Sequence, residues 1–82
     1  MSAMTIFLPE ISDVSEFVNI IGHFPFEAKL KVGSYAVDAK SIMGIFTLDR
    51  EQPVELVANT VDEQQEQSLT QAIGRFLFKP VA

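Results

Sequence analysis

Three places in this sequence carry side chains that could do chemistry. His23 is the only histidine, Ser41 opens an apolar run, and carboxylates gather at 62–66. An imidazole can accept a phosphoryl group, a serine hydroxyl can be phosphorylated, and clustered carboxylates can bind a metal ion. Each group also has an ordinary structural role, which depends on the element that carries it.

The histidine has no neighbours that suit a phosphoryl acceptor. His23 lies between Gly22 and Phe24, with no basic residue nearby in sequence to hold a phosphate. It follows a predicted helix over 11–22, and a glycine such as Gly22 is typical of a helix C-terminus. We therefore interpret His23 as a helix-end or surface residue rather than as a relocated acceptor.

Ser41 stands at the start of a short predicted helix over 41–48. Its hydroxyl could accept a hydrogen bond from a backbone N–H of the first turn, which is the N-cap role that serine often fills. A phosphate at the same place would also be favoured electrostatically. A structural cap and a regulatory phosphorylation are therefore compatible.

The residues after Ser41 are more apolar than a short helix needs. The stretch "SIMGIF" puts four large apolar side chains on two turns, more than one buried side accommodates: Ile42, Met43, Ile45 and Phe46. Met43 is predicted to be exposed, because Ile42 and Ile45 share a side at i,i+3 spacing. An exposed, flexible methionine suits a patch that binds other proteins. We therefore predict partner-binding residues at Ile42, Met43 and Phe46.

The carboxylates at 62–66 fit the start of the last predicted helix, over 62–77. Asp62, Glu63 and Glu66 lie where the helix dipole favours negative charge, so we expect a solvated helix end and no metal site. The chain has no cysteine, no glycine-rich phosphate loop and no Ser-His-Asp set. Neither a bound cofactor nor a stand-alone enzyme is expected.

Length and charge restrict the remaining function classes. The 82 residues suffice for one domain, 1–82, and 48% hydrophobic content is ample for a core. A net charge of −5 with six basic residues disfavours nucleic-acid binding, which needs clustered Lys and Arg. The apolar run near the start is too short for a signal peptide or a membrane span, so we expect a cytoplasmic protein without membrane insertion.

Hydrophobic periodicity divides the chain into alternating strands and helices. The strands are expected at 4–8, 28–32, 35–39 and 54–58, and the helices at 11–22, 41–48 and 62–77. In the first helix, Asp13 and Glu16 have the spacing of a capping box. The last helix is expected to bury one apolar stripe and to end with basic residues: Leu69, Ile73, Phe76 and Leu77, then Arg75 and Lys79.

The most specific structural pattern is a hairpin over 28–39. A two-residue loop, Gly33-Ser34, joins two segments of alternating character. Closure by this loop pairs apolar residues on one face: Val32 with Tyr35, Leu30 with Val37, and Ala28 with Ala39. On the other face Lys29 meets Asp38, so register and charge agree.

The order of these elements is β-α-β-β-α-β-α. It predicts an α+β fold, an open-faced sandwich in which a four-stranded antiparallel sheet carries three helices on one face. This order, together with "AKSIMGIF" (39–46), resembles the HPr family, the phosphocarrier proteins of the bacterial sugar phosphotransferase system. Family members carry a nearly identical Lys-Ser-Ile-Met-Gly run, and the resemblance extends through the hairpin and "PVELVA" (53–58) to essentially the whole chain.

The resemblance fails at the family's active site. HPr proteins have a Gly-Leu-His-x-Arg-Pro-Ala run at the start of the first helix, where the histidine takes a phosphoryl group and the arginine helps to hold it. Here the segment reads "PEISDVSEF" (9–17), without histidine or arginine. An ungapped alignment puts Glu10 at the histidine position, Ser12 at the arginine position and Asp13 at the proline position. Carboxylates repel an incoming phosphate, so the resemblance implies the fold and not the carrier chemistry.

We therefore expect a regulatory or protein-interaction domain without phosphohistidine carrier activity. The resemblance implies phosphorylation of Ser41 by an ATP-dependent kinase, and docking through the exposed part of the helix over 41–48. It also implies protein partners: phosphotransferase components, a serine kinase or a transcription regulator. Two alternatives stay open. One is a working phosphocarrier with another acceptor, and the other is a structural module that self-associates, for instance as a homodimer.

Overall fold

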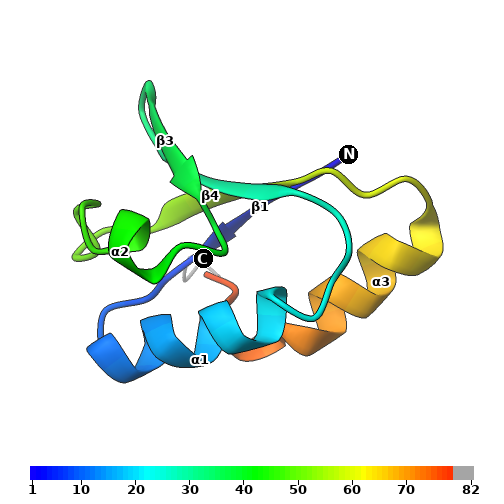
Figure 1. The fold of residues 1–82 in the computed structure, drawn as a ribbon, viewed down its shortest axis with the longest axis horizontal. Coiled ribbons are helices and arrows are strands. Elements are labelled where there is room, and N and C mark those ends of the chain that lie inside the picture. The colour runs from blue at the N-terminus through cyan, green and yellow to red at the C-terminus, as the bar shows by residue number, and fades with distance from the viewer. Residues whose placement is uncertain (79–82) are drawn as a thin grey trace, which may run out of the picture.

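The fold is an open-faced sandwich with one antiparallel sheet and helices on one of its faces (Figure 1). The computed structural model describes residues 1–78. The strand order in the sheet is β1-β4-β2-β3. The elements in chain order are β1 (Ser2–Ile6), α1 (Ile11–Ile21), β2 (Ala28–Val32), β3 (Tyr35–Asp38), α2 (Ile42–Ile45), β4 (Val54–Ala58), α3 (Glu63–Ala72) and a 3₁₀ turn (Gly74–Phe76). The predicted fold class is confirmed.

The β2–β3 hairpin has the predicted register. Val32 lies opposite Tyr35, and Leu30 lies opposite Val37. Gly33 in the two-residue loop has φ 60°, the only positive φ among the described residues, which glycine adopts without steric cost. The tip of the hairpin extends beyond the core, so Tyr35 remains 53% exposed although it shares the apolar face.

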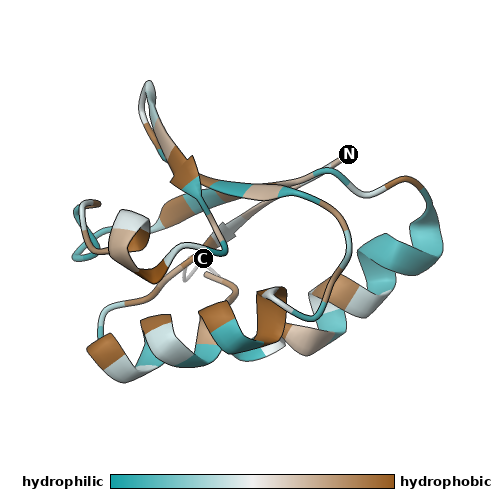
Figure 2. Ribbon diagram, viewed as in Figure 1, coloured by the Kyte–Doolittle hydropathy of each residue, from teal (hydrophilic) through white to brown (hydrophobic). Residues whose placement is uncertain are grey.

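The core lies between the covered face of the sheet and the helices. In α1, Val14, Phe17 and Ile21 are buried at three- and four-residue spacing, as the predicted stripe requires. Every strand and helix except β3 contributes a fully or almost fully buried side chain; examples are Ile6, Leu30, Ile45, Leu56 and Leu69. Figure 2 shows that the first turns of α3 are hydrophilic, so this helix contributes to the core mainly near its C-terminal end.

β1 begins earlier than the predicted strand over 4–8. All five residues of Ser2–Ile6 pair with β4, which fixes the strand in that register. At its start, Ser2 Oγ lies 2.6 Å from Thr60 Oγ1 in a buried position, so a polar contact anchors the strand end. The last residues of the predicted strand lie beyond the ladder, because the chain turns there toward α1.

The start of α1 has a different capping box from the predicted one. Glu10 is the N-cap, and its N–H donates to Asp13 Oδ2 at 3.2 Å. The predicted pairing of Asp13 with Glu16 was wrong, because the helix begins a turn earlier than that pairing requires. Gly22 occupies the C-cap as predicted, in a right-handed conformation with φ −63°.

α3 is shorter than predicted. It spans Glu63–Ala72, and Ile73 leaves the helical conformation with φ −105° and ψ 14°. A 3₁₀ turn follows at Gly74–Phe76, where glycine is a weak helix former. Three members of the expected stripe are buried: Leu69, Ile73 and Phe76. The predicted basic end does not form on α3, since Arg75 lies in the 3₁₀ turn and Lys79 lies outside the described residues.

The last described residues cover the outer edge of β1. Phe7 N–H donates to Phe76 O at 2.8 Å, and Phe78 N–H donates to Thr5 O at 2.9 Å. Leu77, between them, forms an isolated antiparallel bridge to the strand and is partly buried. β1 therefore has hydrogen-bonding neighbours on both sides, which removes a free sheet edge. These bonds explain why the chain leaves the helix before residue 77.

Candidate functional site

Ser41 caps α2 as predicted. Its Oγ accepts a hydrogen bond from Gly44 N–H at 3.1 Å, and its backbone is extended, as an N-cap requires. A Cβ atom on Gly44 would lie only 3.2 Å from Ser41 Oγ. The glycine in "SIMG" thus leaves the room that the cap occupies.

The apolar residues of α2 divide between the core and the surface. The helix is shorter than the predicted 41–48, spanning Ile42–Ile45. Ile45 is fully buried, and Ile42 is partly buried against the core. Met43 is 72% exposed and Phe46 is 37% exposed. The predicted exposure of Met43 is confirmed, and Phe46 shares the surface with it.

Arg50, in the loop after α2, connects this helix to the start of α1. Its guanidinium carbon lies 5.2 Å from the centroid of the Phe46 ring. Its Nη1 lies 3.4 Å from each of two acceptors, the carbonyl oxygens of Leu8 and Pro9. Hydrogen bonds of this length are weak, so the contact with the aromatic ring contributes much of what holds the Arg50 side chain in place. The contact escaped the sequence analysis because Leu8 and Arg50 are 42 positions apart.

The start of α1 carries carboxylates at the segment that the sequence alignment matched to the phosphoryl-accepting site of HPr proteins. Glu10 and Ser12 are exposed, Asp13 is partly buried, and Glu16 lies one turn further along. Asp13 accepts the Glu10 N–H through Oδ2, which leaves its Oδ1 for another partner. A helix start with carboxylates is stabilised by the dipole, but it repels a phosphate dianion.

Arg75 supplies that partner from the opposite end of the chain. Its Nη2 lies 3.0 Å from Asp13 Oδ1 and 2.9 Å from Glu16 Oε2. The guanidinium carbon is also 4.4 Å from the centroid of the Phe76 ring. One arginine therefore bridges two carboxylates of α1 and stacks on its own neighbour. No local pattern in the sequence predicts this contact, which joins residues 62 positions apart.

Solved structures with a similar fold are known. HPr-C-His from Thermoanaerobacter tengcongensis matches with a TM-score of 0.71 and 27% identity, over 90% of this chain and 92% of that chain. The catabolite repression containing protein Crh of Bacillus subtilis, an intertwined dimer with a swapped domain, matches with a TM-score of 0.63 and 25% identity, over 90% and 88%. The histidine-containing phosphocarrier protein of Mycoplasma shares the fold, with a TM-score of 0.66 at 14% identity over 88% and 91%.

The similarity covers 88–90% of this chain. In fold the chain is similar to HPr proteins, which supports the resemblance found in its sequence. No model of a known protein family matches the sequence, and no curated protein sequence matches it either. The similarity to HPr proteins therefore rests on tertiary structure, in agreement with the "AKSIMGIF" stretch.

The chain holds its single histidine far from the start of α1. His23 follows the C-terminal end of the helix, is exposed, and has Nδ1 2.7 Å from Asn19 O. A helix of eleven residues separates it from Glu10, which is roughly 16 Å at 1.5 Å per residue. The predicted helix-end role of His23 is confirmed by its position.

A hollow of about 390 Å³ lies beside the start of α1. Its walls are mostly apolar, with one ion pair: Phe7, Pro9, Asp13, Arg75, Phe76, Leu77 and Phe78. The guanidinium and the carboxylate in the wall bind each other, so neither is left to orient a small ligand. The hollow is thus a gap beside the packed C-terminal segment rather than a developed ligand site.

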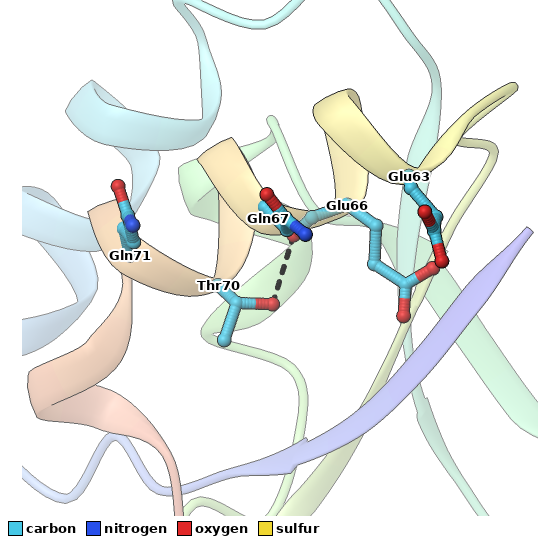
Figure 3. A pocket seen from close by; sticks show the side chains of 5 residues that line it. All are labelled: Glu63, Glu66, Gln67, Thr70 and Gln71. Atoms are coloured by element: carbon cyan, nitrogen blue, oxygen red, sulfur yellow. Dashed lines mark hydrogen bonds between the residues drawn. The ribbon is translucent and has the colours of Figure 1, made fainter.

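A second hollow, of about 360 Å³, follows the outer side of α3 (Figure 3). It is lined by residues of that helix alone, spaced at three and four positions: Glu63, Glu66, Gln67, Thr70 and Gln71. Thr70 Oγ1 donates to Glu66 O at 2.8 Å, so the hydroxyl is engaged within the helix. One helical stripe does not enclose a ligand, and we assign this surface no site. Within residues 1–78, no helix has the length and hydrophobicity needed to cross a membrane.

Proposed function

We propose that this chain is a regulatory protein-binding module of the HPr type that does not carry phosphoryl groups on histidine. The observation that carries the proposal is that carboxylates, paired in part with Arg75, stand at the start of α1. Where the family holds a phosphoryl-accepting histidine, this chain holds Glu10, and the adjacent Asp13 is already paired with Arg75. A phosphoryl group entering there would meet carboxylates rather than a free cation.

A module without the carrier reaction would act through protein binding, and the exposed side of α2 is the surface that we propose for it. Met43 and Phe46 are exposed beside a capped, well-packed helix start, an arrangement that suits docking of another protein. The partners we expect are components of a sugar phosphotransferase system, a serine kinase or a transcription regulator. This part of the proposal draws on the similarity to HPr-C-His and to Crh, a catabolite repression containing protein.

Ser41 is the residue that we propose as a regulatory phosphorylation site. Its hydroxyl caps α2 and the residue is partly exposed, next to the exposed Met43. A phosphate there would add about two negative charges beside the docking surface, enough to weaken or strengthen binding according to the partner's charge. Incubation with an HPr-type serine kinase and ATP, followed by mass spectrometry, tests this; the variant Ser41→Ala is the control.

The test of the main proposal is a phosphotransfer assay with phosphoenolpyruvate and the first enzyme of the phosphotransferase system. We expect no acid-labile phosphohistidine on this chain, while an authentic HPr in the same reaction becomes labelled. A label on His23, abolished by His23→Ala, would overturn the proposal in favour of a working carrier.

Self-association is the second candidate, and the exposure of Met43 and Phe46 favours it. The intertwined dimer of Crh shows that a protein of this fold can associate with its own copy. Static light scattering distinguishes a 9.1 kDa monomer from a dimer of twice that mass. A stable dimer whose formation requires Met43 would support the structural module instead of a docking module.

A further inference from the structure

At one end of the molecule α2 lies near the start of α1 (Figure 1). These two elements and the residue that follows α2 carry three exposed apolar side chains. They are Ile11 at 66% exposure, Met43 at 72% and Phe46 at 37%. Arg50 joins the two elements, because it contacts the Phe46 ring and also the carbonyl of Pro9, two residues before Ile11. We call this surface the α1–α2 face.

The charges that surround the α1–α2 face are mainly negative. Carboxylates come from the first turns of α1 and from the loop after α2: Glu10, Asp13, Glu16, Asp49 and Glu51. The basic residues of the same region are Arg50, Arg75 and Lys40, which directly precedes Ser41. The excess of acids agrees with the net charge of −5 for the whole chain.

Of these three cations only Arg75 is paired with carboxylates, while Lys40 Nζ donates to Phe24 O at 2.7 Å. Arg75 pairs with Asp13 and Glu16, which neutralises much of that local charge. Arg50 rests on the Phe46 ring, and its Nη1 points to backbone carbonyls. Within residues 1–78, the ion pairs leave Glu10, Asp49 and Glu51 without a basic partner. The five carboxylates outnumber the three cations, so the net charge around the apolar centre is negative.

We propose that the partner of the α1–α2 face is a protein surface in which Lys and Arg surround an apolar contact residue. The inference rests on the proposed docking function and adds the chemistry of the partner. An apolar centre provides contact area, and a rim of opposite charge provides steering and selects against wrong partners. A second copy of this chain is disfavoured as the occupant, because it would bring an acidic rim against an acidic rim.

The experiment uses two synthetic amphipathic peptides with the same apolar residues, one flanked by lysines and the other by glutamates. Binding to the full chain is measured by fluorescence anisotropy at low and high salt, and the contact region by amide chemical shifts. We expect the lysine peptide to bind at least tenfold more tightly at low salt, with shifts confined to the start of α1 and to α2. Screening by salt should reduce this difference.

Two charge-neutralising variants separate local from overall electrostatics. Glu10→Gln with Glu51→Gln removes two rim carboxylates, and Glu63→Gln with Glu66→Gln removes two on α3. The rim variant should weaken the lysine peptide about three- to tenfold at low salt, as expected for two exposed charge contacts. The α3 variant should change its affinity less than twofold, because its charges lie away from the face.

The outcomes distinguish this inference from the docking function on which it depends. Equal or absent binding of the two peptides, or shifts that map to α3, would overturn the inference. Stable dimerisation of the chain through Met43 at low salt would also overturn it. If a physiological partner requires Met43 but is insensitive to Glu10 and Glu51, the docking function stands and the inference about partner charge fails. Insensitivity to Met43→Ser as well would remove the docking function itself.

Discussion

At the scale of single residues, the α2 segment divides its apolar side chains by position rather than by type. Ile45 is fully buried and Met43 is 72% exposed, although they are two positions apart on one short helix. Residues two apart lie on nearly opposite sides of a helix, so packing the first against the sheet turns the second to solvent. Hydrophobicity alone would have assigned both to the core.

Met43→Asp should leave the free energy of unfolding within about 0.5 kcal/mol of the parent, as substitutions at exposed positions usually do. Urea denaturation provides the measurement. The matched control is Ile45→Ala, which removes buried methyl groups from the same helix and should cost about 2–5 kcal/mol. A loss of several kcal/mol for Met43→Asp would place this side chain in the core and contradict the exposed patch.

Ser41→Ala should destabilise the protein by about 1 kcal/mol, because Gly44 N–H loses its side-chain acceptor. In a domain of this size that loss corresponds to a decrease in Tm of about 4–8 °C, measurable by calorimetry. Ser41→Asp is the control, since aspartate caps about as well as serine. Equal melting of the alanine and parent proteins would show that the cap contributes nothing.

At the scale of elements, the start of α1 is stabilised by a backbone cap and by ion pairs between its carboxylates and Arg75. Asp13 accepts both the Glu10 N–H and the Arg75 guanidinium, through different oxygens. Arg75 is 53% exposed, so its ion pairs contribute modestly to stability despite short distances. Their larger effect is on chemistry, because they occupy the arginine that a bound anion would need.

Asp13→Ala should lower the free energy of unfolding by about 1 kcal/mol, through loss of the capping acceptor. Asp13→Asn keeps an acceptor oxygen for Glu10 N–H and loses the ionic charge, so it should cost less than about 0.5 kcal/mol. Chemical denaturation of the two variants in parallel separates the cap from the ion pair. A cost for Asn as large as that for Ala would assign the main contribution to Arg75.

At the scale of the whole molecule, sheet edges and net charge determine how the chain meets other copies of itself. β1 is hydrogen-bonded on both sides, to β4 and to residues 76–78. Its backbone groups are therefore not free to pair with a strand of another copy. The opposite edge is β3, which has only four residues. The charge of −5 adds repulsion between copies at low ionic strength.

Sedimentation velocity should therefore show a monomer at about 10 mM salt, where charges act over about 30 Å. At about 1 M salt, where the Debye length is about 3 Å, weak association through the α1–α2 face becomes detectable if apolar contact suffices. Met43→Asp should abolish that association. A dimer that is as stable at low salt as at high salt would show that contacts other than this face hold the copies together.

Several features of the protein were determined by residues close together in sequence. The hairpin register follows from a two-residue loop and alternating side chains, and Val32 opposite Tyr35 was predicted from these alone. Ser41 is a cap because its acceptor and Gly44 N–H are three positions apart. The α1 stripe is likewise local. In each case the interacting groups lie within one turn or one hairpin, so spacing decides the geometry.

Other features were decided only by the tertiary structure. Arg75 was expected to end a helix, yet it pairs with Asp13, and Arg50 was not singled out although it contacts Pro9. β1 took its limits from its pairing with β4, and α3 ended early because residues 76–78 pair with β1. These contacts join segments that are distant in sequence, and sheet pairing brings them together. No local spacing encodes such a contact, because its free energy is realised only when the chain has folded.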